Sequence, residues 1–288
     1  MASSKKPKYP VETPEESKIS LTELANNPES RTPIIVCVDC SYSMLQNGRL
    51  YKMMEGLERF RRELENDPIA ADSVELCIVS YGGTSARVEC DFESPDRLKI
   101  PELHADGETP LADAVFTAHT ILQRRLERYN KVGVSHYRPW LVLIGDGDES
   151  QSMRDLDKAA RLLKTESDEK HLSVLCVSVG DADKAEYTSL GKLSPDGQVQ
   201  YLNDLRFMDF FGWLRGSAIA AQKRRIYNEE TNALLPAGIG ACGRAAVCLR
   251  LRESGGLCAV CGGAYGLWLT RRRERQLRRR RGAEGDQG

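Results

Sequence analysis

Short apolar runs alternate along this sequence with longer segments in which apolar residues recur every three or four positions. Runs that are rich in β-branched residues are typical of buried strands. They occur at 34–39, 74–81, 140–144, 172–179 and 199–202. The segment 86–92 alternates apolar and polar residues, which predicts a short edge strand paired as a hairpin with the strand before it.

The spacing of three and four predicts helices with one buried face. These segments lie at 50–64, 111–126, 156–163 and 208–221, with a shorter one at 184–190. Residues 1–31 are expected to form a mobile arm or a short lead-in helix around Leu21–Asn26. Because strands and helices alternate, we predict an α/β fold with a mostly parallel sheet and helices on both faces.

Polar oxygens follow the first predicted strand. The run ends in Asp-x-Ser-x-Ser, so Asp39, Ser41 and Ser43 place one carboxylate and two hydroxyls in one turn. Ligands bind at the carboxyl edge of an open α/β sheet. An all-oxygen set is the kind that a hard cation such as Mg²⁺ accepts.

Two later loops carry further oxygens. Thr109 lies in a Gly-x-Thr-Pro segment, and Asp146 follows the strand at 140–144. Parallel strands bring their carboxyl ends to one edge, so we expect these loops to converge on Asp39. Two carboxylates at one place repel each other unless a cation compensates. The set predicts a site for Mg²⁺ or Mn²⁺ with a position open to water or an incoming ligand.

This set of residues resembles the metal-ion-dependent adhesion site of von Willebrand factor A (VWA) domains. The resemblance covers about residues 32–220, with the elements in the same order. The segments YRPWLVLI at 137–144 and FFGWL at 210–214 are similar to the bacterial intracellular TerY/YegL-like branch. Two positions depart from the family's pattern. Tyr42 fills a position that is usually small, and Gly145 precedes Asp146 where threonine is usual.

The resemblance implies a Rossmann-like domain that binds proteins through Mg²⁺, or through Mn²⁺ or Ca²⁺. The three hydroxyls would bind the metal directly or through water, and the two carboxylates would ligate it or orient waters. A partner's Asp or Glu would take the open position, and Tyr42 would either narrow access to it or contribute to the binding face. Intracellular members are associated with tellurite or stress-response operons, next to kinase-like and phosphatase-like proteins. Such a protein complex is the setting that the resemblance implies.

Other interpretations of the same turn stay open. Asp and Ser are favoured helix N-caps, so the turn after Asp39 could cap a helix without a metal. A metal-dependent phosphohydrolase also places Asp and Mg²⁺ at strand ends. Its Asp-x-Asp pair would supply a nucleophile and a general acid, but here Ser41 stands at the second position. We therefore expect a protein that is not an enzyme.

Composition indicates an intracellular globular protein. The chain has 288 residues, of which 41% are hydrophobic and 29% charged, and this is long enough for one sizeable domain and an appendage. Its nine cysteines are an odd number, and several lie in strand-like runs, which argues against a secreted disulfide scaffold. No signal peptide or membrane-spanning apolar run is seen. We expect a cytoplasmic protein with no membrane span.

The composition changes after about Leu235. Residues 236–288 contain eleven arginines and four acidic residues, so they carry a net charge of +7 and the rest of the chain carries −8. The predicted organisation is a flexible arm at 1–31, the VWA domain at 32–225, and a linker with a Cys/Arg-rich tail at 226–288.

The tail has several interpretations. Cys258 and Cys261 have the spacing of a zinc knuckle, and Cys242 and Cys248 could complete a four-thiolate Zn²⁺ site. Some relatives in the branch carry a zinc-ribbon-like C-terminal segment. A disordered tail and an altered, out-of-frame end of the gene are the alternatives. The arginines at 271–281 could bind nucleic acid or acidic surfaces, but no aromatic residues are interleaved with them to support specific nucleic-acid recognition.

Overall fold

The computed structural model describes residues 19–27, 29–146, 152–179, 189–202 and 210–218. The chain divides into two units, Met1–Arg215 and Gly216–Gly288. The second unit has only residues 216–218 in the described part. The fold below is therefore that of the first unit.

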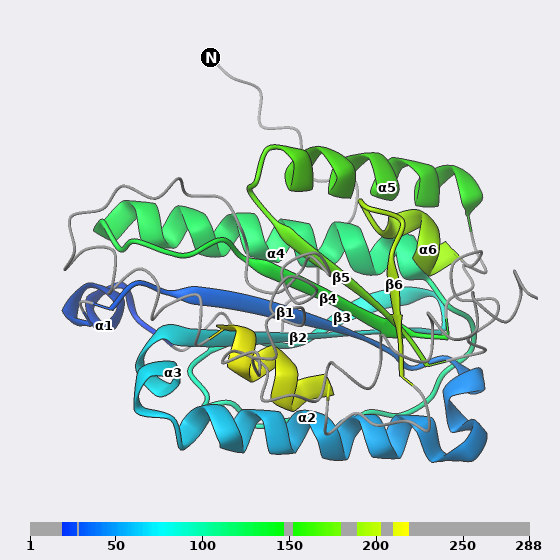
Figure 1. The fold of residues 1–288 in the computed structure, drawn as a ribbon, viewed down its shortest axis with the longest axis horizontal. Helices are drawn as coiled ribbons and strands as arrows, with labels where there is room; N and C mark the ends of the chain where they lie inside the picture. The colour runs from blue at the N-terminus through cyan, green and yellow to red at the C-terminus, as the bar shows by residue number, and fades with distance from the viewer. Residues whose placement is uncertain (1–18, 28, 147–151, 180–188, 203–209, 219–288) are drawn as a thin grey trace, which may run out of the picture. The chain divides into compact units, whose positions relative to one another are not determined.

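Within the described residues, six strands form one sheet in the order β3-β2-β1-β4-β5-β6 (Figure 1). They are β1 (Thr32–Asp39), β2 (Val74–Gly82), β3 (Ser85–Glu93), β4 (Trp140–Gly145), β5 (Ser173–Ser178) and β6 (Val199–Tyr201). Of these strands β3 alone is antiparallel, as the hairpin partner of β2, and the others pair in parallel. The prediction of a mostly parallel sheet with an edge hairpin is confirmed.

Helices cover both faces of this sheet (Figure 1). On one face lie α4 (Leu111–Val132), α5 (Met153–Asp168) and the short α6 (Ser189–Leu193), and on the other lie α2 (Arg49–Glu65) and α3 (Pro68–Ser73). The other helical segments are α1 (Leu21–Asn26), the 3-10 segment η1 (Tyr42–Gly48) and residues 210–218. The predicted α/β fold class is confirmed.

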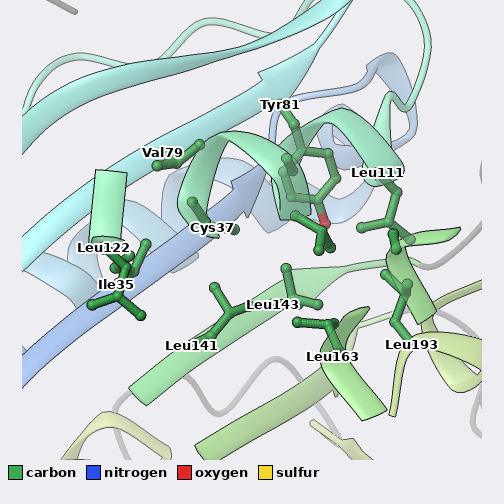
Figure 2. Close-up of a cluster of buried hydrophobic side chains, with 14 of the residues drawn as sticks. Ile35, Cys37, Val79, Tyr81, Leu111, Leu122, Leu141, Leu143, Leu163 and Leu193 are labelled. Atoms are coloured by element: carbon green, nitrogen blue, oxygen red, sulfur yellow. The ribbon is translucent and has the colours of Figure 1, made fainter. Parts of the chain in front are cut away.

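The central strand β1 is buried along its whole length. Successive side chains of a strand point to opposite faces, and Ile35 and Cys37 belong to a buried cluster with Val79, Leu122 and Leu143 (Figure 2). Burial on both faces explains why this strand is a nearly continuous apolar run. It also makes β1 a fixed support for the polar turn that follows Asp39.

The segment Asn66-Asp67-Pro68 ends α2 and also begins α3. The Asp67 carboxylate accepts hydrogen bonds from the N–H groups of Ile69 and Ala70, and Pro68 occupies the first helical turn. Both are ordinary signals for a helix start. No helix was predicted between residues 64 and 74 from the sequence.

Several sequence predictions fall outside the described residues. These are the arm up to residue 18, residues 184–188 of the predicted short helix, residues 208–209 and 219–221 of the predicted last helix, and the whole tail with Cys242, Cys248, Cys258 and Cys261. No helix among the described residues is both long and apolar enough to cross a membrane.

Candidate metal centre

Asp39 ends β1, and its side chain is fully buried. Its Oδ1 accepts a hydrogen bond of 2.8 Å from the backbone N–H of Ser41, which closes a tight turn directly after the strand. The Oγ atoms of Ser41 and Ser43 lie 2.8 Å apart. The polar side chains of the Asp-x-Ser-x-Ser turn therefore lie together.

The serines of this turn do not cap the helix that follows. Ser41 occupies the N-cap position of η1, but its side chain makes no capping hydrogen bond. Its hydroxyl contacts that of Ser43 instead. A turn that served only as a cap would direct the serine oxygen at the free N–H groups of the helix. The geometry therefore favours another role for the hydroxyls.

Backbone hydrogen bonds hold the loop before α4 against this turn. The N–H of Asp106 donates to the carbonyl of Cys40 at 2.7 Å, and the N–H of Tyr42 donates to the carbonyl of Gly107 at 3.2 Å. Thr109 is two residues beyond Gly107 and is 8% exposed. These contacts bring Thr109 to the same edge of the sheet as the serine hydroxyls.

Asp146 reaches this edge from β4, the parallel neighbour of β1. Val38 is paired with Ile144, so the two strands end side by side. The charge of Asp146 acts on the Asp39 carboxyl. Arg49, the first residue of α2, places its Nη1 3.6 Å from Oδ2 of Asp146. The structure thus brings all five predicted ligand residues to one edge of the sheet.

Gly145, the departure noted before Asp146, has no room for a side chain. A Cβ there would lie 2.5 Å from the hydroxyl oxygen of Tyr81 and 2.7 Å from Oδ2 of Asp39. The Tyr81 side chain is buried in the core cluster (Figure 2), and its hydroxyl donates a hydrogen bond of 2.9 Å to the carbonyl of Ile144. Tyr81 therefore occupies space that a threonine at position 145 would need.

Sequence reasoning missed Tyr81 and Arg49. Tyr81 ends an apolar run and was predicted only as part of a strand, and Arg49 precedes a predicted helix without any motif. Both reach the site through contacts between segments that are distant in the sequence. The polar atom of Tyr81 at the end of a strand was the one available signal.

The surroundings of the Asp39 carboxyl disfavour its charged form. Burial raises its pKa from 3.8 to about 7. Hydrogen bonds from Ser41 and from the backbone of Asp146 oppose this shift, and the negative charge of the Asp146 side chain adds to it. Its Oδ2 is buried and has no hydrogen-bond partner among the described residues. A nearby cation would favour the charged form of this carboxyl and supply a partner for the open oxygen.

The residues present fit a hard divalent cation. The candidate ligands are oxygen atoms throughout, from Asp39, Ser41, Ser43, Thr109 and Asp146. Among the described residues, no group of three or more His, Cys, Asp or Glu side chains could hold a metal ion. Two carboxylates alone are too few ligands for such a cation. The hydroxyls are therefore needed to complete the site.

A mostly parallel sheet with helices on both faces defines an α/β domain of the Rossmann-like class. Residues 34–211 match the model of the von Willebrand factor type A domain. This chain belongs to the VWA domain family, whose members generally mediate metal-dependent protein–protein interaction. The prediction of the VWA fold is confirmed. The adhesion site itself and the TerY/YegL-like branch stay predictions.

Solved structures share the fold at low sequence identity. The vWF domain of the type V pili tip protein Mfa5 from Porphyromonas gingivalis is 11% identical, with a TM-score of 0.52, over 67% of this chain and 96% of that one. The pilus adhesin SpaC from Lactobacillus rhamnosus GG is 11% identical, with a TM-score of 0.51, over 67% of this chain and 30% of that one.

A von Willebrand factor type A protein from Catenulispora acidiphila is 16% identical, with a TM-score of 0.47, over 66% of this chain. This chain spans 43% of the length of that protein. A comparison with curated proteins gives no match. At these identities the likeness to Mfa5 and SpaC shows the fold alone.

Proposed function

We propose that residues 32–225 form a Mg²⁺-dependent protein-binding module. The observation that carries this proposal is the Asp39 carboxylate, which is fully buried, lies beside a second carboxylate and has an oxygen atom with no hydrogen-bond partner among the described residues. A buried carboxylate is costly to the fold unless it is paired. A bound divalent cation neutralises the two carboxylates and offers a coordination position to a partner's oxygen.

Five side chains hold the cation in this proposal. The hydroxyls of Ser41, Ser43 and Thr109 contact it directly or through water. The carboxylates of Asp39 and Asp146 ligate it or orient waters. Mn²⁺ and Ca²⁺ also prefer oxygen ligands and are expected to substitute. The partner supplies an Asp or Glu side chain, and Tyr42, which is 61% exposed beside the site, contacts that partner.

The module binds its partner without chemical turnover. The turn after β1 has Ser41 where a phosphohydrolase of the Asp-x-Asp kind has its general acid. We place the protein in a cytoplasmic stress-response or tellurite-resistance complex with kinase-like or phosphatase-like proteins. The resemblance to the TerY/YegL-like branch supports this setting. The described cysteines support it too, because all are free thiols: Cys37, Cys40, Cys77, Cys90 and Cys176.

Capture of the partner from a lysate of the source cells tests the proposal. The full chain is immobilised in Mg²⁺ or in EDTA, and the retained proteins are identified by mass spectrometry. We expect a protein that is retained in Mg²⁺, released by EDTA, and not retained by Asp146→Asn. The matched control is Asp168→Asn, which alters an exposed carboxylate paired with Lys164 on α5. Retention that is unchanged in EDTA would contradict the proposal.

A further inference from the structure

We propose that the partner's acidic residue is flanked by large apolar side chains, and that these dock on an apolar rim beside the metal site. The rim consists of Tyr42, Leu45 and Tyr51. This inference rests on the metal-dependent binding proposed above, because it specifies the chemistry of the segment that the same site receives.

Exposed apolar residues gather next to the candidate ligands. The large apolar side chains that the described residues expose are Leu21, Tyr42, Leu45, Tyr51 and Met153. The rim residues lie within 42–51, directly after Ser41, and are 61%, 59% and 74% exposed in chain order. One exposed apolar residue needs no explanation, but a group of them beside polar ligands is typical of an interaction surface.

The rim is held in place by its own segment. Tyr42 and Leu45 are three residues apart in the 3-10 segment η1, which puts their side chains on the same side. Met44, between them, is fully buried, and the N–H of Tyr42 is bonded to the carbonyl of Gly107. The backbone leaves helical geometry at Gln46 and Asn47, and Tyr51 follows in the first turn of α2. The part of the rim formed by Tyr42 and Leu45 is fixed in this way, and such a surface loses little conformational entropy when a partner binds.

Positive charge accompanies the rim. Arg49 lies between Leu45 and Tyr51 in the chain, and its guanidinium is 3.6 Å from the carboxylate of Asp146. Lys52, the next residue after Tyr51, is exposed. Arg49 is already paired with Asp146, so Lys52 and a bound divalent cation supply the positive charge that makes this surface complementary to a carboxylate beside apolar groups. Aromatic side chains and arginine are the residue types that are enriched in protein interfaces.

A random peptide library displayed on phage tests this pairing of an acid with apolar neighbours. The full chain is immobilised in Mg²⁺, and bound phage are eluted with EDTA. We expect the enriched peptides to carry Asp or Glu next to Leu, Phe, Tyr or another large apolar residue. A synthetic consensus peptide should bind Tyr42→Ser and Leu45→Ser about tenfold more weakly than the unaltered chain. Leu21→Ser removes an exposed leucine on α1, outside the rim, and should leave the affinity unchanged.

Each other outcome overturns part of the account. Enriched acids without apolar neighbours, or affinities that Tyr42→Ser and Leu45→Ser leave unchanged, would remove the rim and leave the metal-dependent module standing. An equal loss in Leu21→Ser would also remove the rim. Enriched peptides that lack an acid, or that EDTA does not release, would overturn the proposed function as well. No enrichment in Mg²⁺ would overturn the inference.

Discussion

Two buried carboxylates lie on adjacent strands of the sheet, at opposite ends. Glu75, near the start of β2, is 3% exposed, and Asp39, at the end of β1, is 0% exposed. Oε2 of Glu75 accepts from Nε of Arg125 at 2.7 Å and from the Tyr129 hydroxyl. Nη2 of Arg125 is 2.6 Å from the same oxygen, and Nε of Arg31 is 3.4 Å from Oε1. The chain itself therefore supplies the cations that stabilise Glu75.

Asp39 has a different environment. It accepts a hydrogen bond from the backbone N–H of Ser41, its Oδ2 has no partner among the described residues, and it faces the charge of Asp146. Arg49, which reaches this edge from the start of α2, is paired with Asp146. The contrast indicates that Glu75 is a structural carboxylate, and it supports the proposal that a cation bound from solution completes the surroundings of Asp39.

The largest effect on stability is expected for Glu75, the carboxylate that the chain itself pairs with arginines. Glu75→Gln removes the negative charge between Arg125, which is 1% exposed, and Arg31. An unpaired buried charge is strongly unfavourable, so the free energy of unfolding should fall by about 3–5 kcal/mol in a urea titration. The rise of the melting temperature with Mg²⁺ should persist. A loss of stability below about 1 kcal/mol would show that Glu75 does not stabilise the fold through its arginine partners.

The stability of the metal-free fold should depend on pH through Asp39. The pKa of Asp39 is raised from 3.8 to about 7. Between these values the metal-free fold holds a proton that the unfolded chain has lost, so the stability from this group falls as pH rises and is fully lost above pH 7. By linkage the fall is at most about 4 kcal/mol.

The measurement is urea unfolding in EDTA at pH 5 and pH 8, for the unaltered chain and for Asp39→Asn. The variant lacks the titrating group, so subtracting its curve removes the contribution of all other groups. We expect the unaltered chain to lose stability relative to Asp39→Asn as pH rises. A difference between the two proteins that is the same at both pH values would contradict the raised pKa.

Gly145→Ala should displace the side chains of Tyr81 and Asp39. The new Cβ would lie 2.5 Å from the Tyr81 hydroxyl and 2.7 Å from Asp39 Oδ2, and such overpacking costs about 1–3 kcal/mol. The response of the melting temperature to Mg²⁺ should weaken too, and adding Tyr81→Phe should recover part of the stability. Gly212→Ala is the matched control, because a Cβ there meets nothing within 4 Å. Equal effects of the two alanines would contradict this account.

The smallest effect is expected at Arg49. Its pair with Asp146 is partly exposed: the Arg49 side chain is 16% exposed and that of Asp146 is 17% exposed. Such pairs contribute about 0–1 kcal/mol to stability. Arg49→Met should therefore leave the stability in EDTA nearly unchanged. It should increase the Mg²⁺ affinity in isothermal titration calorimetry, because it removes a cation that competes for the Asp146 carboxylate. A decrease in affinity would mean that Arg49 supports the metal site instead.

Elements with a strong local pattern were predictable from the sequence. The helix at Leu21–Asn26 forms at the residues expected, where Ser20 and Glu23 make a reciprocal capping box. The strands follow the apolar runs, with bounds shifted by at most a few residues. The end of α4 was placed too early, at 126, because the buried Tyr129 and the left-handed Gly133 that ends the helix were not counted.

For the candidate site, residue types and loops were predictable, but their contacts were not. The Asp-x-Ser-x-Ser turn after β1 is a local signal. The bonds from Asp106 to Cys40 and from Tyr42 to Gly107, which bring Thr109 to the turn, join segments that are distant in the sequence. No local pattern carries such contacts.

The most direct test of the central claim is a Mg²⁺ titration of the melting temperature of the full chain at pH 8, beside Asp39→Asn and the surface control Asp168→Asn. A ligand that binds only the folded state stabilises it by about 2.7 kcal/mol at 100 times its dissociation constant. The melting temperatures of the unaltered chain and of Asp168→Asn should rise with Mg²⁺, and that of Asp39→Asn should not. An equal rise in Asp39→Asn would contradict the claim that the unpaired carboxylate of Asp39 marks a metal site.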